Sequence, residues 1–178
     1  MAAAPTKSPL APDGFPDLPS VDGVTFATIA AGVRYAGRTD VKLAKLAAGT
    51  TIAGVFTKST TRAAPVLDCQ TKLGGDASAR AAILVNSGNA NAFTGKNGQA
   101  SVNAICEAVS DTCGVPVSRV FTSSTGVIGE PLAHDRIIQN LIALDAGQNA
   151  GAVEAAAEAI MTTDTYAKGS HQTVHIDG

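Results

Sequence analysis

The feature that most constrains the fold is an apolar run followed by a loop and then an amphipathic helix. Residues 81–85 are continuously apolar and end at Asn86, which is typical of a buried strand. After a Gly- and Asn-containing loop over 87–98, apolar residues recur at helical spacing, and Gly114 suits a C-terminal cap. The residues with this spacing are Val102, Ile105, Cys106, Val109 and Cys113. A strand that leads through a loop into such a helix indicates a domain in which helices pack on a sheet.

Shorter patterns predict the remaining elements. Strands are predicted at 24–29, 33–35, 41–46, 52–56, 119–122 and 169–176. A short helix is predicted at 64–67, where Pro65 limits it to a first turn, and longer helices are predicted at 131–145 and 150–161. Because the strands come first and the strand–loop–helix units follow, we expect a mixed α/β domain and not a doubly wound nucleotide fold.

Composition narrows the functional classes. The 178 residues suit one globular domain, in which residues 1–20 are predicted to form an extended N-terminal arm. A net charge of −2 without a basic stripe argues against nucleic acid, and no apolar run approaches the length of a membrane span. Residues 1–20 resemble neither a secretory signal nor a transit peptide, so a cytoplasmic protein is expected.

The cysteines and histidines predict neither disulfides nor a metal site. The three cysteines, at 69, 106 and 113, are odd in number and form no CxxC pair. Cys106 and Cys113 fall on the apolar face of the predicted helix and are expected to be buried, reduced and inert. The three histidines lack metal-ligand spacing; they are His134, His171 and His175.

The Asn-containing loop after the 81–85 strand superficially resembles a phosphate-binding loop. Six residues separate Gly88 from Gly95 where that motif needs four, and Asn97 stands where a Ser or Thr would contact magnesium. Nucleotide binding through this loop is therefore excluded. Two interpretations stay open: a rigid loop shaped by its Asn residues, or direct contact with a substrate.

Two further segments place hydroxyl groups beside turns. The Ser-Thr-Gly sequence at 124–126 is either a tight strand-to-helix connection or a pair of oxyanion donors. The Thr-rich segment at 162–165 either caps the last carbonyls of the preceding helix or forms a polar wall for a small substrate with an amino or amide group. No nucleophile motif accompanies them, since G-x-S-x-G and S-x-x-K are absent and no cysteine is paired with a recognisable base. An attacking group is therefore expected to lie elsewhere.

Four blocks of this sequence resemble, in the same order, the ornithine acetyltransferase family, the bifunctional glutamate N-acetyltransferases of arginine biosynthesis. The blocks are 53–57 with 63–66, the loop 86–92, the Ser-Thr-Gly-Val-Ile-Gly turn at 124–129, and 159–164. The resemblance covers nearly all of residues 15–178.

The resemblance implies a mechanism and roles for three residues. In this family a precursor cleaves itself at an Ala-Thr bond, and the new N-terminal Thr of the β chain becomes the nucleophile, with its own α-amine as base. An acetyl group moves from N-acetylornithine, or from acetyl-CoA in some members, through the enzyme to glutamate. By match to the family motifs, the Thr125 side chain and the Gly126 backbone N–H form the oxyanion hole, and Thr162 binds substrate. Apart from acetyl-CoA as an alternative substrate, no cofactor is implied.

The resemblance also implies that this chain is the α-chain portion of such an enzyme, over residues 21–178. The expected fold is an α/β sandwich of stacked sheets flanked by helices and completed by a β chain, with further assembly to α2β2 or higher. The family's Ala-Thr cleavage site, with the Gly-rich segment that precedes it, is expected to lie beyond Gly178. Two alternatives remain: a truncated non-catalytic paralogue or amino-acid-binding interaction module, and a subunit of an N-terminal-nucleophile amidohydrolase.

Overall fold

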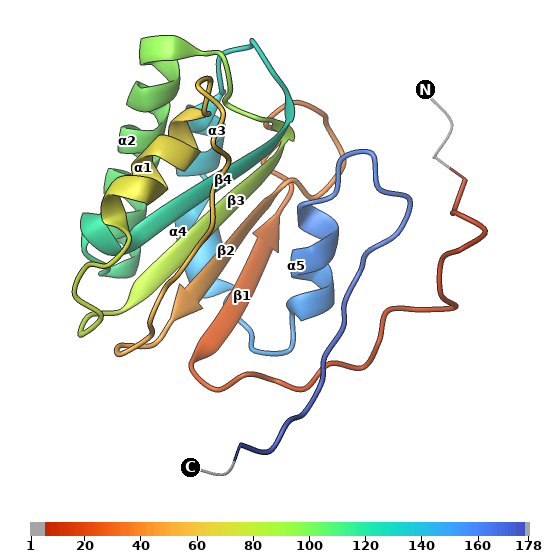
Figure 1. Ribbon diagram of the computed structural model, residues 1–178. Helices are drawn as coiled ribbons and strands as arrows, with labels where there is room; N and C mark the ends of the chain where they lie inside the picture. Colours follow the sequence, from red (N-terminus) through yellow and green to blue (C-terminus); the bar gives the residue numbers. More distant parts are fainter. Residues whose placement is uncertain (1–5, 177–178) are drawn as a thin grey trace.

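The chain forms one four-stranded mixed sheet with helices packed against it (Figure 1). The computed structural model describes residues 6–176. The strands lie in the order β1 (Val24–Ile29), β2 (Val41–Leu46), β3 (Ala81–Asn89) and β4 (Val120–Val127). The first three are antiparallel, whereas β4 runs parallel to β3. The predicted α/β class is confirmed, and within the described residues this is the one sheet present.

The parallel pair depends on the helix with the clearest sequence pattern. Helix α2 (Gly95–Cys113) connects β3 to β4, because a parallel neighbour requires a crossover. It ends as predicted at Gly114, which adopts the left-handed conformation with φ 64° and donates its N–H to the Ser110 carbonyl at 3.0 Å.

The core lies between the sheet and helices α2, α3 (His134–Ile138) and α4 (Leu141–Ala146). The strand register places Leu43 opposite Leu84, so both point to the same face. That face meets the apolar stripe of α2 together with Ile137, Leu141 and Leu144. Burying each of these side chains contributes about 1.5–3 kcal/mol.

The other two helices cover different parts of the sheet. Helix α5 (Val153–Ala159) packs against β1 and β2, and α1 (Ala64–Lys72) packs against β4 and α2 (Figure 1). Ser87 lies three positions after Leu84 on β3, and because side chains alternate between the two faces of a strand, it points to the opposite face. The Ser87 hydroxyl donates to the Ala159 carbonyl at 2.8 Å, so α5 lies on the face away from α2.

Two predicted strands in the first third are wrong. Residues 33–35 form a bend, because the Asp40 carboxylate accepts the backbone N–H groups of Ala31 and Val33 at 2.7 and 2.6 Å and turns the chain. Residues 52–56 are irregular, and Val55 is fully exposed. Neither segment pairs with a strand of the sheet, whose order is β1-β2-β3-β4.

The other differences concern element boundaries and the last strand. Helix α1 extends well beyond its first turn, since a Pro at the start of a helix removes only an N–H that has no intrahelical partner. The helix predicted at 131–145 is two short helices separated at 139–140. Residue Arg119 belongs to a 3₁₀ turn (Val117–Arg119) that precedes β4, and no strand forms at 169–176.

The N-terminal arm lies beside the C-terminal segment. Residues 6–20 contain neither helix nor strand, and residues 1–5 of the predicted arm lie outside the described range. The Ser8 N–H donates to the Thr165 hydroxyl at 3.1 Å, which ties the two segments together.

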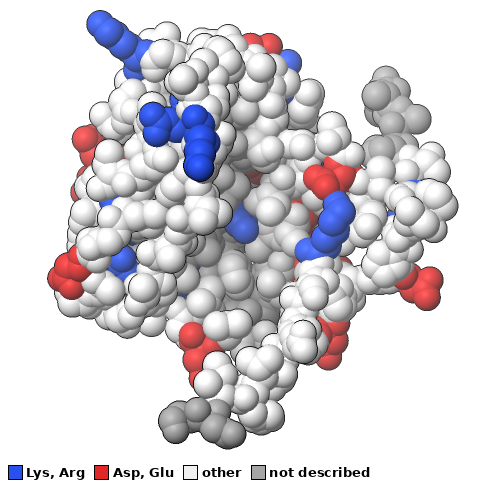
Figure 2. Space-filling view, in the orientation of Figure 1, with Lys and Arg blue, Asp and Glu red and all other residues white. Residues whose placement is uncertain are grey.

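The surface has few charged groups. One group of basic side chains lies near the top of the view in Figure 2, and elsewhere on this face the charges are scattered around a central hollow. Within residues 6–176, the structure contains no helix that is both long and apolar enough to cross a bilayer.

Candidate active site

A cleft at the carboxyl ends of β3 and β4 brings together the residues singled out from the sequence. It has a volume of about 440 Å³, within the range of small-molecule sites. Thr125 and Gly126 line it from β4, and Thr162 lines it from the segment after α5. The other lining residues are Tyr35, Arg38, Gly88, Val127 and Thr163. The carboxyl ends of parallel strands are a common place for ligand sites in α/β folds.

Glycines shape the floor of this cleft. Gly126 has φ +130° and faces Gly88 across the parallel pair. A Cβ at Gly126 would lie 2.4 Å from the Gly88 carbonyl carbon, which no side chain tolerates. The ladder shifts register at Gly88 and Asn89 as a bulge. The Ser-Thr-Gly sequence is therefore the end of a strand that continues to Val127, and the interpretation as a tight strand-to-helix turn is wrong.

The cleft presents hydroxyl groups without internal partners. Thr125 and Thr162 are half-buried, and among residues 6–176 neither hydroxyl has a hydrogen-bond partner. The carbonyls that a Thr162 cap would bind are occupied by other groups: Ser87 binds the Ala159 carbonyl and Arg38 binds the Met161 carbonyl. The structure thus disfavours the capping interpretation and leaves both threonine hydroxyls accessible to a ligand.

The Asn-containing segment is held together by its own side chains, and its first part, to Asn89, continues strand β3 beyond the predicted end at residue 85. The Asn86 amide donates to the Asn89 carbonyl at 2.9 Å, and the Asn91 amide donates to the Gly98 carbonyl at 3.1 Å. Asn86, Asn89 and Asn91 are all buried. None of these three Asn residues lines the cleft, so for them the structure favours the rigid-loop interpretation, whereas Gly88 of the same segment does line it. The Asn86 side chain also accepts a hydrogen bond from Ser124 at 2.7 Å, which couples this loop to β4 just before the site.

The loop between β1 and β2 supplies a wall of the cleft that the sequence analysis did not identify. Tyr35 and Arg38 lie on this loop, which the two hydrogen bonds to the buried Asp40 carboxylate hold in place. The sequence signal for this loop is Arg-Thr-Asp at 38–40, a polar stretch that separates two apolar segments. The apolar pattern at 33–35 predicts a strand instead, which hides the loop.

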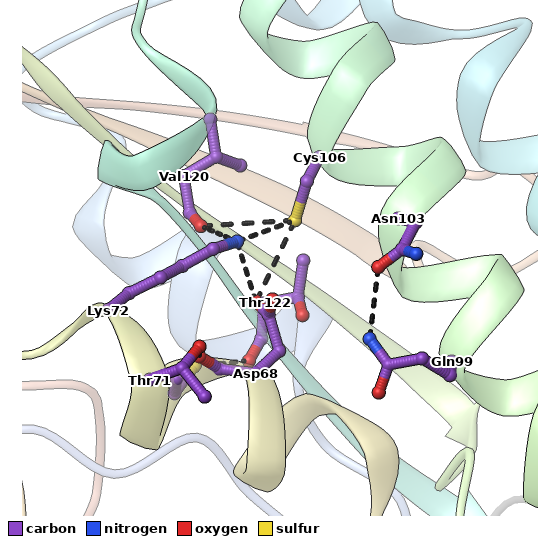
Figure 3. A network of polar contacts seen from close by, with 9 residues as sticks. Asp68, Thr71, Lys72, Gln99, Asn103, Cys106, Val120 and Thr122 are labelled. Atoms are coloured by element: carbon purple, nitrogen blue, oxygen red, sulfur yellow. Dashed lines mark hydrogen bonds and ion pairs between the residues drawn. The ribbon is translucent and has the colours of Figure 1, made fainter.

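A second polar cluster lies outside the cleft and is structural (Figure 3). The Lys72 ammonium donates to the Asp68 carboxylate at 2.7 Å, to the Val120 carbonyl at 2.9 Å and to the Cys106 sulfur at 3.2 Å. Burial raises the pKa of the Cys106 thiol to about 11, so it is not a nucleophile at neutral pH. The cluster fastens α1 to β4 and α2.

The other two thiols also have raised pKa values. All three cysteines are free, and Cys106 and Cys113 are buried as expected. Burial also raises the pKa of Cys69 and takes that of Cys113 to about 11. Within the described range, no three His, Cys, Asp or Glu side chains gather where they could hold a metal ion.

The fold and the cleft define an α/β protein with a small polar ligand site at the ends of its two parallel strands. The chain belongs to the ArgJ family, whose model matches residues 25–178. It is 64% identical over 178 residues to the arginine biosynthesis bifunctional protein ArgJ of Ruegeria pomeroyi. It is 49% identical over 169 residues to the protein of the same name from Bradyrhizobium diazoefficiens.

Two crystal structures share the fold. The ArgJ protein of Bacillus halodurans superposes with a TM-score of 0.75 at 30% identity, over 89% of this chain and 92% of that one. Ornithine acetyltransferase of Mycobacterium tuberculosis, crystallised with ornithine, gives a TM-score of 0.75 at 32% identity, over 86% and 91%.

The coverage differs between the two kinds of relative. The match to the Ruegeria protein covers all of this chain and 44% of that protein. The match to the Bradyrhizobium protein covers 95% of this chain and 40% of that protein. The chain therefore spans less than half the length of these relatives, whereas it spans nine-tenths of the crystallised chains.

Proposed function

We propose that this chain is the α subunit of a glutamate N-acetyltransferase of arginine biosynthesis and supplies the oxyanion hole and part of the substrate site. The observation that carries the proposal is the position of Thr125, Gly126 and Thr162 in one cleft of a chain that belongs to the ArgJ family. The ornithine in the crystals of the Mycobacterium relative supports a site for an amino acid of this size.

In the proposed reaction, the chain stabilises charge and a second chain attacks. The hydroxyl of an N-terminal Thr on the β chain attacks the acetyl carbonyl of N-acetylornithine, and its own α-amine takes the proton. The Thr125 hydroxyl and the Gly126 N–H donate to the carbonyl oxygen as it gains negative charge; one such donor is worth about 2.7–4 kcal/mol of barrier. Ornithine leaves, and the amine of glutamate then takes the acetyl group. Acetyl-CoA is an alternative first donor, and no cofactor is needed.

The proposed partner is a β chain cut from the same precursor. The matched chain in each crystallised relative is about as long as this one, whereas the full-length relatives are more than twice as long, and this difference supports division into two chains. We further propose that the β chain adds the second sheet of a sandwich, and that the α and β chains assemble to α2β2 or higher in the cytoplasm.

The test combines the mass and the activity of the protein expressed from its complete gene. Intact mass spectrometry should find an α chain containing this sequence and a second chain that begins with Thr. The purified protein should then transfer acetyl from N-acetylornithine to glutamate. A single uncleaved species without transfer would support the non-catalytic paralogue. Hydrolysis of N-acetylornithine that does not require glutamate would support the amidohydrolase.

A further inference from the structure

We propose that Arg38 binds the α-carboxylate of the amino-acid substrate and so makes the site specific for α-amino acids over amines. This inference rests on the proposed function, because it names a contact within the same cleft. Arg38 lies on the loop between β1 and β2, and that loop takes part in none of the sequence blocks that carried the family resemblance.

The charge of the cleft points to an anionic ligand group. Among its lining residues, Arg38 is the only side chain with a full charge, and no carboxylate lines it. The other polar side chains are neutral hydroxyls, including Thr125, Thr162 and Thr163. An unneutralised guanidinium among neutral groups favours a ligand that brings a negative charge.

Arg38 is held in place and still has hydrogen-bond capacity. One of its terminal nitrogens donates to the Met161 carbonyl, which fixes the side chain beside Thr162. A guanidinium has five N–H donors, so most remain available for a carboxylate. Among residues 6–176, Arg38 forms no ion pair. The neighbouring Arg34, in contrast, is already paired with Glu130.

The substrates of the proposed reaction share the group that would bind Arg38. N-acetylornithine, ornithine and glutamate all carry an α-carboxylate next to the nitrogen that gives up or accepts the acetyl group. A planar two-point contact between guanidinium and carboxylate would therefore orient both the donor and the acceptor. The acetyl carbonyl would remain free to reach Thr125 and Gly126.

The experiment pairs a change in the protein with a matching change in the substrate. Full-length wild-type enzyme and Arg38→Gln are assayed with N-acetylornithine and with N-acetyl-1,4-diaminobutane, which lacks only the carboxylate. In the wild type, loss of the carboxylate should lower kcat/KM roughly 10- to 100-fold, the usual range for a charged hydrogen bond. Arg38→Gln should lower kcat/KM for N-acetylornithine by a similar factor, mostly through KM, and should leave the value for the decarboxylated substrate nearly unchanged.

Controls separate carboxylate binding from a structural role. Arg80→Gln removes an exposed arginine that does not line the cleft and should leave both substrates unaffected, while Arg38→Lys should recover part of the preference for the carboxylate. An equal loss of activity with both substrates in Arg38→Gln would overturn the proposal, because Arg38 would then act only by positioning the 161–163 segment. A wild type that does not distinguish the two substrates would also overturn it.

A binding measurement keeps this inference separate from the proposed activity. Calorimetric titration of ornithine and of 1,4-diaminobutane needs no turnover. Absence of acetyl transfer in the wild type would refute the proposed function. Arg38-dependent preference for ornithine in the same titration would still support the carboxylate contact, and equal binding of both ligands would refute it.

Discussion

Gly126 on β4 packs directly against Gly88 on β3, so that the two backbones touch where the cleft begins. A Cβ at Gly126 would lie 2.4 Å from the carbonyl carbon of Gly88 and 2.7 Å from the Asn89 nitrogen. The contact fixes the position of the Gly126 N–H, which is the proposed oxyanion donor. The same glycine thus sets both the spacing of the strands and the geometry of the site.

Replacing Gly126 by Ala should separate β3 from β4 locally. The clash with backbone atoms adds to the strain of φ +130°, so we expect a destabilisation of about 3 kcal/mol and loss of most acetyl transfer. Thermal unfolding and initial rates of the full-length protein measure the two effects. Gly129→Ala is the matched control: it also has a positive φ, but nothing lies within 4 Å of its added Cβ, so activity should largely survive. Equal behaviour of the two variants would contradict the close-contact argument.

Thr125→Ala should lower turnover and leave substrate binding nearly unchanged. A donor that acts on the developing oxyanion contributes in the transition state and little before it, so kcat should fall about 10²- to 10³-fold while KM stays similar. Thr125→Ser keeps the hydroxyl and should retain most activity. Ser123→Ala, two residues earlier on the same strand and exposed, serves as a surface control. Full activity in Thr125→Ala would remove this residue from the oxyanion hole.

Asp40→Asn should loosen the loop that carries Tyr35 and Arg38. The two oxygens of the buried carboxylate accept the N–H groups of Ala31 and Val33, and an amide offers only one oxygen. One backbone N–H then loses its partner, which costs about 1–3 kcal/mol. We expect a lower unfolding midpoint together with a raised KM. Unchanged stability would mean that these two hydrogen bonds do not hold the loop.

Lys72→Met should lower the free energy of unfolding far more than Lys168→Met does. Both lysines pair with an Asp four residues earlier, but the Lys72 and Asp68 side chains are each only 11% exposed. Removing the ammonium leaves the Asp68 charge buried without a partner, which we expect to cost about 3 kcal/mol. Lys168 is exposed, and its removal should have little effect. Denaturant unfolding of both variants tests the comparison, and similar losses would show that the buried pair is not special.

The thiols should react in the order of their burial. With a pKa of about 11, Cys106 and Cys113 have about 100-fold less thiolate at pH 8 than a thiol with the ordinary value of 9.0. Iodoacetamide at pH 8 should therefore label half-buried Cys69 first, as peptide mass mapping would show. Labelling of Cys106 as fast as Cys69 would contradict its burial.

The raised pKa values of the buried thiols predict how the free energy of unfolding changes with pH. A thiol with a raised pKa in the folded state keeps its proton there while the unfolded chain loses it. The resulting stabilisation is complete below pH 9 and is lost as the pH rises from about 9 to 11. Cys106→Ala should flatten this decline, and urea midpoints at pH 8 and 10 measure it. An unchanged slope in that variant would assign the decline to other groups.

Several elements could be predicted from the sequence because their local and tertiary requirements agree. The strands at 24–29 and 41–46 and the helix that ends at Gly114 have apolar periodicities that match the faces they bury. The strand predictions at 33–35 and 52–56 are wrong because pairing partners, and not local propensity, decide whether an apolar run joins a sheet. The break at 139–140 carries no proline or glycine, so the pattern over 131–145 resembled one helix.

The sequence by itself determined the α/β class and the helix that ends at Gly114, and its family resemblance singled out Thr125, Gly126 and Thr162 as candidate site residues. These depend on periodicity and on short motifs, which are local. Only the tertiary structure decided that the three residues share one cleft, that Asn86, Asn89 and Asn91 are structural, and that Arg38 is the cation of the site. Those facts depend on parallel pairing of β3 with β4 and on a loop turned by Asp40, and both are contacts between segments distant in sequence.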